Sequence, residues 1–265
     1  MIKLFKSLSI PYIISLSVLF VVFIAISLFT EMPFFIYISL FIVLELIINF
    51  TFTMLAKKKH DKLFNIHLDD CDPDKLIKEY YPLLANAGDN LVDLVLLNLS
   101  AGYLYVGDFN SAQNALNNVR FHKLTNPYFK IIYYSNQVCL CSEMDKITEA
   151  QGFLEALKNT IDTMKKLKNM DKNKILLLYN SYVSAMNMKK DCYEGVEQQI
   201  FVLLQNSTNK AYMVVYKFNL AELYLKTGRV EEAKRLFEFV VQNGNTMYVV
   251  KEAEKYLAEL IDIKL

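Results

Sequence analysis

The chain has 265 residues, of which 54% are hydrophobic, and its mean hydropathy is +0.20. Lys and Arg number 29 and Asp and Glu number 28, which gives a formal net charge of +1. This oily and balanced composition excludes a disordered chain. Nucleic-acid binding is not expected, because cations are not in excess and the only arginines are Arg120, Arg229 and Arg235.

The apolar excess is concentrated at the amino-terminal end. Residues 7–30 contain no charged side chain, and residues 32–56 contain only Glu45. Each run exceeds the roughly 20 helical residues that cross a hydrocarbon core. The sequence therefore predicts a two-pass transmembrane hairpin over residues 1–56. Its two spans and the turn between them are expected at about 10–29, 34–55 and 30–33.

A secretory signal is the alternative for the first span, because Lys3 and Lys6 precede it and residues 25–27 resemble a cleavage site. The apolar stretch is longer than a signal usually has, and a second span follows at once, so the hairpin is favoured. Lysines occupy positions 57–59 after the second span, whereas the turn has no Lys or Arg. Because excess Lys and Arg marks the cytoplasmic side, both termini and the carboxyl-terminal domain are expected to be cytoplasmic.

Glu45 lies near the middle of the second span, and Asn49 follows one turn later on the same stripe. A carboxylate at that depth is costly unless it is protonated, paired or facing protein. Two hypotheses remain open. In the first, Glu45 contacts another membrane helix or takes part in proton or ion binding. In the second, it is a neutral acid that is hydrogen-bonded to Ser17 or to a helix carbonyl.

Residues 57–72 are predicted to be a basic and polar linker, because the segment from His60 to Asp72 shows no apolar period. His67 and Cys71 belong to a group of acidic, His and Cys residues here, but their spacing is not that of a metal site. The cysteines at 71, 139, 141 and 192 are expected to be free thiols. No nucleophile or phosphate-loop motif occurs, so we expect no enzyme, no catalytic residue, no metal and no cofactor.

The remaining segment, 73–265, is predicted to be helical. Asp72 and Pro73 have the residue types of a helix cap and first turn, and Pro82 should kink that helix. Residues 99–112 and 220–233 share Leu, Tyr, Gly, an apolar residue and Ala at the same offsets. These segments resemble the tetratricopeptide repeat (TPR), a helical hairpin of about 34 residues.

Two weaker copies fit between them. The equivalent small or apolar positions are Ala112, Ala150, Val196 and Ala233, at spacings of 38, 46 and 37. The expected fold class is therefore all-α, with a two-helix transmembrane hairpin followed by an α-solenoid of TPR-like hairpins. A helix at about 247–263 should cap the stack.

In the resembled family, ligands bind the concave side, which the first helix of each hairpin forms. The resemblance implies a partner-binding groove made of Leu97, Ala101, Leu104, Tyr105, Ser135, Cys139, Ser142, Ser181, Ala185, Met188, Phe218, Glu222, Leu225 and Lys226. A clamp for a terminal carboxylate is not evident, because this side has little basic character. It is predicted to take an apolar or helical segment. The alternative is that the carboxyl-terminal helix or a neighbouring chain fills it.

The predicted function is a membrane-tethered scaffold that recruits a protein or peptide partner through this groove. The first alternative is a peptide-responsive regulator. The second is a small subunit of a membrane transport or secretion assembly that uses Glu45. An enzyme would need a deep pocket that gathers several polar groups. The sequence does not predict the oligomeric state.

Overall fold

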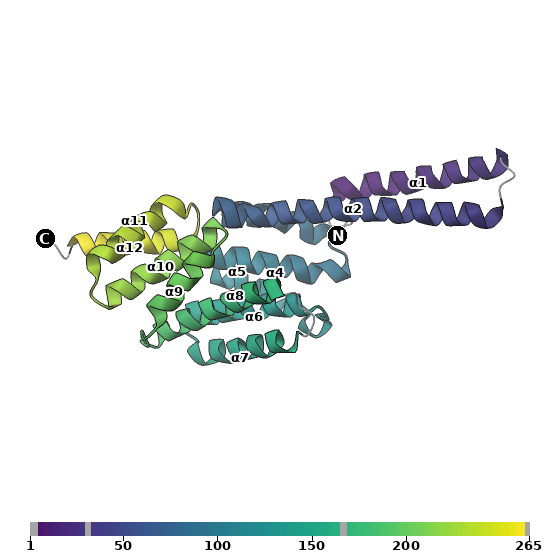
Figure 1. The fold of residues 1–265 in the computed structure, drawn as a ribbon. Helices are drawn as coiled ribbons and strands as arrows, with labels where there is room; N and C mark the ends of the chain where they lie inside the picture. Colours follow the sequence, from purple (N-terminus) through teal and green to yellow (C-terminus); the bar gives the residue numbers. More distant parts are fainter. Residues whose placement is uncertain (1–4, 30–32, 165–168, 263–265) are drawn as a thin grey trace.

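The computed structural model describes residues 5–29, 33–164 and 169–262. Within these ranges the chain is helical and contains no strand. Figure 1 shows a long two-helix hairpin projecting from a group of shorter helices, with the carboxyl terminus at the far end from the hairpin.

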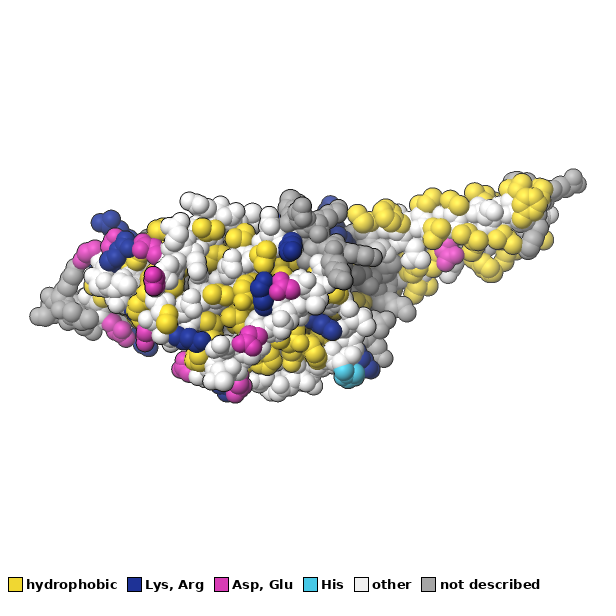
Figure 2. Space-filling model, turned by 60° about the horizontal axis from the view of Figure 1, so that its bottom comes forward, with side chains coloured by type: hydrophobic (Ala, Val, Ile, Leu, Met, Phe, Trp, Pro, Cys, Tyr) yellow, Lys and Arg dark blue, Asp and Glu magenta, His cyan; other side chains and the backbone are white. Residues whose placement is uncertain are grey.

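The hairpin consists of α1 (Lys6–Phe29) and the first part of α2 (Phe34–Asp70), and both helices are long and apolar enough to cross a membrane. Apolar side chains predominate on the face of the hairpin that Figure 2 shows. The hydroxyl of Tyr12 donates a hydrogen bond to Asn49 Oδ1 at 3.1 Å, which ties the two helices together. Of the expected turn, only Pro33 belongs to the described residues.

The prediction of a polar linker at 57–72 is wrong, because α2 continues as one helix to Asp70. Its 37 residues span about 55 Å, roughly 25 Å more than a hydrocarbon core needs. His67 and Cys71 are 2% and 0% exposed, so this end of α2 is packed rather than solvated. This part of α2 contacts α10 through a few buried residues only. They lie among polar residues, so they produced no recognisable helical period of apolar residues in the sequence.

After Cys71, α3 (Pro73–Tyr80) begins as the sequence predicted. The Asp72 carboxylate accepts a hydrogen bond from the Lys75 backbone N–H at 3.0 Å, and Pro73 occupies the first turn. The α-helix then gives way to a 3₁₀ segment, η2 (Tyr81–Asn86), because Pro82 has no N–H to continue the ladder.

Eight helices then follow as four pairs. Each pair consists of two helices that are consecutive in the sequence and pack against each other. The pairs are α4 (Asp89–Val106) with α5 (Phe109–Asn117), α6 (Pro127–Glu143) with α7 (Ile147–Thr163), α8 (Asn169–Lys189) with α9 (Val196–Asn206), and α10 (Lys210–Lys226) with α11 (Val230–Asn243). A short 3₁₀ segment, η3 (Phe121–Lys123), precedes α6, and α12 (Tyr248–Asp262) follows the last pair.

The first helix ends in the same way in all four pairs, although the connection from α8 to α9 is longer and contains a second residue with positive φ, Gly195. A residue with positive φ stands there, at Gly107, Asp145, Asp191 and Gly228. The next residue donates its backbone N–H to the carbonyl five residues earlier, at 2.9, 2.8, 2.9 and 2.7 Å respectively. This is the bond of a Schellman helix end, and Asp tolerates the left-handed conformation better than most residues.

These four turns are spaced 38, 46 and 37 residues apart, the spacings that the sequence comparison predicted. Ala112, Ala150, Val196 and Ala233 are each 0% exposed, five residues after their turns. The predicted spacing of these buried positions therefore extends to the two middle pairs, which lack the turn glycine, although Val196 is the first residue of its helix and the three alanines are the fourth of theirs.

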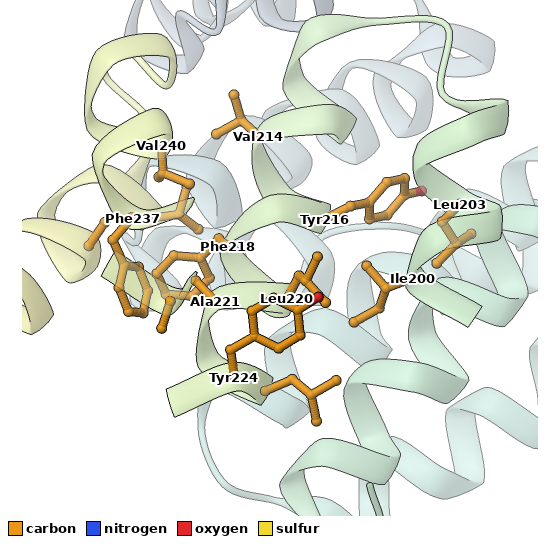
Figure 3. Packing of buried hydrophobic residues seen from close by; sticks show 14 of the residues in the cluster. Ile200, Leu203, Val214, Tyr216, Phe218, Leu220, Ala221, Tyr224, Phe237 and Val240 are labelled. Atoms are coloured by element: carbon orange, nitrogen blue, oxygen red, sulfur yellow. The ribbon is translucent and has the colours of Figure 1, made fainter. Parts of the chain in front are cut away.

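The largest hydrophobic core cluster surrounds α10. Figure 3 shows Ile200 and Leu203 of α9 on one side of this helix and Phe237 and Val240 of α11 on the other. Cys71 belongs to the same cluster, so the end of α2 is part of the core that holds the last two pairs together.

Candidate functional site

The first helices of the four pairs, α4, α6, α8 and α10, surround one cavity of about 370 Å³. Met247, just before α12, and Tyr248, Val249 and Tyr256 of α12 complete the wall. Pockets that hold a drug-sized ligand have volumes of about 300–1,000 Å³, so this cavity lies near the lower end of that range.

Eleven of the fourteen residues that the resemblance implied line this cavity: Ala101, Leu104, Tyr105, Cys139, Ser142, Ser181, Ala185, Met188, Phe218, Glu222 and Lys226. The other three, Leu97, Ser135 and Leu225, do not. Leu97 belongs to the core cluster between α4 and α5, and Ser135 is buried.

Tyrosines dominate the wall. Tyr105, Tyr182, Tyr212 and Tyr216 come from three of the first helices, and Tyr248 and Tyr256 come from α12. Burial raises the pKa of Tyr216 to about 12 and that of Tyr105 well above its ordinary value. Their hydroxyls are therefore neutral, and each can both donate and accept a hydrogen bond.

Two carboxylates lie in the wall, and α12 reaches both of them. The hydroxyl of Tyr248 donates to Glu143 Oε2 at 2.8 Å, and that of Tyr256 donates to Glu222 Oε1 at 3.1 Å. Burial raises the pKa of Glu222, and the neighbouring negative charge of Glu143 adds to this effect. These bonds attach α12 to the ends of α6 and α10.

The two lysines of the wall are paired with aspartates of the turns. Lys189 Nζ lies 3.7 Å from Asp145 Oδ1, and Lys226 Nζ lies 3.3 Å from Asp191 Oδ1. Both aspartates are exposed, so these ion pairs stand at the rim rather than inside the cavity.

Cys139 also lines the cavity, and burial raises the pKa of its thiol to about 12. A thiol with such a pKa stays protonated near neutral pH and is a poor nucleophile. The four cysteines are free. Across the described ranges, no group of three or more His, Cys, Asp or Glu side chains has the arrangement of a metal site.

The wall is continuous with the long helix α2. The imidazole of His67 packs on the ring of Tyr105, with 3.9 Å between the ring centroids. Neither ring nitrogen of His67 has a hydrogen-bond partner among the described residues, and burial lowers its pKa to about 4.

Sequence reasoning missed several wall residues, above all Tyr182, Tyr212, Tyr216, Tyr248 and Tyr256. Tyr212 and Tyr216 are four residues apart on α10, which was a usable signal for one helix face. Tyr248 and Tyr256 were not found in this way, because α12 was expected either to cap the stack or to fill the groove, and not to supply single residues of its wall.

In the hairpin, Asn49 accepts the hydrogen bond from the Tyr12 hydroxyl. Glu45 forms no hydrogen bond or ion pair with another described residue, including Ser17. The side chain of Glu45 is half-buried within the hairpin.

Comparison with known proteins adds no relative from which a function could be transferred. No family model, no curated protein and no solved structure matches this chain.

Proposed function

We propose that this chain is a membrane-anchored stack of TPR-like hairpins that recruits a protein partner by holding a short peptide segment of it in the central cavity. The observation that carries this proposal is the cavity itself, to which the first helices of four consecutive pairs all contribute. The repeated turn geometry supports the likeness to TPR units in a solenoid.

A short extended segment suits the cavity better than a helix does. A helix with its side chains is about 10–12 Å wide and binds grooves over several turns. Here α12 already lies along one wall, and the remaining volume is about 370 Å³. Tyrosine hydroxyls and the side chains of Asn136 and Asn219 offer hydrogen bonds to a peptide backbone.

The two apolar helices support the membrane anchor, and the lysines at 57–59 favour a cytoplasmic location for both termini and for the hairpin pairs. Anchoring raises the effective concentration of the cavity near the bilayer, so a weakly bound segment could still hold its parent protein there. The proposed role is binding without chemistry, which the protonated thiol of Cys139 supports.

A binding experiment with a blocked cavity tests this proposal. The full chain in lipid nanodiscs is incubated with a soluble library of random pentapeptides, and retained peptides are identified by mass spectrometry. Ala185→Phe places an aromatic ring in the cavity and should abolish retention. Ala258→Phe, at an exposed site on α12, is the matched control and should retain the same peptides. Equal retention by the two variants would contradict the proposal.

The peptide-responsive regulator is a second candidate, because one observation favours it specifically. His67 on α2 contacts Tyr105 in the cavity wall, so a ligand that displaces Tyr105 also pushes on the helix that enters the membrane. Crosslinking between the spans, at Tyr12→Cys and Phe52→Cys, would detect it, since their rings are 5.5 Å apart. The regulator predicts that peptide changes the crosslinking rate, whereas the passive scaffold predicts no change.

A further inference from the structure

The two carboxylates of the cavity wall form no ion pair with a cationic side chain of the described residues. Glu143 is the last residue of α6, and Glu222 lies about one turn before the end of α10. Each accepts one hydrogen bond from a tyrosine of α12, and neither forms an ion pair with a described residue. A carboxylate has about four lone-pair sites, so both retain acceptor capacity toward a ligand.

The nearby lysines act on Glu222 only at a distance, because their charges lower its pKa but neither lysine forms an ion pair with it. Lys189 and Lys226 also line the cavity, but they pair with Asp145 and Asp191 in the exposed turns, and Lys226 Nζ also lies 3.4 Å from the Met188 carbonyl oxygen. These two pairs account for the basic charge of the wall. The charge left without an ionic partner is that of Glu143 and Glu222.

The backbone adds to the negative potential at this end of the cavity. Glu143, Lys189 and Lys226 are the last residues of α6, α8 and α10, and all three line the cavity. Helix carboxyl-terminal ends carry a partial negative charge and favour cations. Lys189 and Lys226 complement two of these ends, whereas α6 ends with an acid.

Aromatic rings line the same cavity as the two carboxylates. Tyr248 touches Glu143 through its hydroxyl, and Tyr105, Tyr182, Tyr212 and Tyr216 line the same cavity. The face of an aromatic ring is electronegative and attracts ammonium and guanidinium groups. A cavity lined by both carboxylates and tyrosine rings therefore suits a positively charged group.

We infer that the cavity selects a cationic peptide, whose protonated amine or guanidinium group binds between Glu143 and Glu222. This inference rests on the proposed peptide-binding function and specifies its ligand. The cation comes from a Lys or Arg side chain or from a free peptide amino terminus.

The pentapeptide library described above tests the inference when it is prepared in two forms, with free and with acetylated amino termini. Peptides retained by the full chain but not by Ala185→Phe should be enriched in Lys or Arg, or should require the free amino terminus. The acetylated form distinguishes these two sources of the cation. Glu222→Gln and Glu143→Gln should each weaken binding of a retained peptide about tenfold or more, since each removes a charge-assisted hydrogen bond.

Glu155→Gln, on the exposed side of α7, is the matched control and should bind as the parent does. Far-UV circular dichroism verifies that each variant is folded. Cavity-dependent peptides without a cation, or binding insensitive to both Gln variants, would overturn the inference and leave the proposed function standing. If no peptide depends on the open cavity, the proposed function fails and the inference fails with it.

Discussion

His67 and Tyr105 stack with their ring centroids 3.9 Å apart and their planes inclined by 44°. His67 belongs to α2, which begins in the apolar hairpin, and Tyr105 belongs to α4 and lines the cavity. The end of α2 is also held by the loop before α12, because Asn245 Nδ2 donates to the Asp70 carbonyl oxygen at 3.0 Å. One uninterrupted helix thus joins the candidate membrane span to the cavity wall.

Replacement of His67 by Phe should remove a pH dependence of stability. The folded pKa of His67 is about 4, below the ordinary value of 6.5, so protonation favours the unfolded chain. Above pH 6.5 the ring is neutral in both states and leaves the free energy of unfolding unchanged. As the pH falls from 6.5 toward 4, the unfolded chain takes up the proton first, and the free energy of unfolding decreases by about 3 kcal/mol in all. The unfolding temperature of His67→Phe should therefore exceed that of the parent by a margin that grows over this window.

This is measured by far-UV circular dichroism of the full chain in detergent, because the protein has no Trp to report by fluorescence. A margin that stays constant from pH 7.5 to pH 4.5 would mean that His67 is not buried as a neutral ring.

The two turn glycines give a matched pair of variants. Gly107 and Gly228 have φ of +84° and +80°, so Ala at either position costs about 1–2 kcal/mol of backbone strain. At Gly107 the added Cβ would also meet Tyr248 Cβ at 3.0 Å, whereas at Gly228 nothing lies within 4 Å. Gly107→Ala should therefore lower the unfolding temperature more than Gly228→Ala and expose α12 to limited proteolysis. Equal effects would show that α12 does not rest on this turn.

Glu45 separates the cavity proposal from a function inside the membrane. It has no hydrogen bond to a described residue and lies 22 positions before His67 on α2. We expect Glu45→Leu and Glu45→Gln to leave peptide retention in nanodiscs unchanged. Asn49→Leu is the comparison, because it removes the acceptor of the Tyr12 hydroxyl and should loosen the hairpin by roughly 0.6 kcal/mol. Loss of a co-purified membrane partner in the Glu45 variants alone would favour the transport or secretion assembly.

Cys192 reports the side of the membrane on which the hairpin pairs lie. It is the exposed one of the four cysteines, while Cys71 and Cys141 are buried and Cys139 faces the cavity. A membrane-impermeant maleimide should label it only after the membrane is opened, and Cys192→Ser should remove that labelling. Labelling of Cys192 in intact cells would place the domain outside and contradict the cytoplasmic location.

Local patterns were sufficient for much of the fold. The Asp72 cap was predicted from residue type, and the glycines at 107 and 228 stood out because they share an offset in two similar segments; both features depend on backbone chemistry within a few residues. Asp145 and Asp191 replace Gly in the middle turns, so the sequence indicated these turns only through the spacing of the small or apolar positions after them. Most of the groove residues that the resemblance implied line the cavity, because residues at helical spacing on the first helices share a face.

The sequence by itself determined two apolar spans, an all-helical carboxyl-terminal segment and the spacing of its turns, since these follow from hydrophobicity and backbone preference over short distances. Only the tertiary structure decided that α2 continues past Lys59 to bury His67, and that tyrosines of α12 reach Glu143 and Glu222. Those contacts join residues from 34 to 105 positions apart, and the free energy of each depends on burial against a partner that no local pattern names.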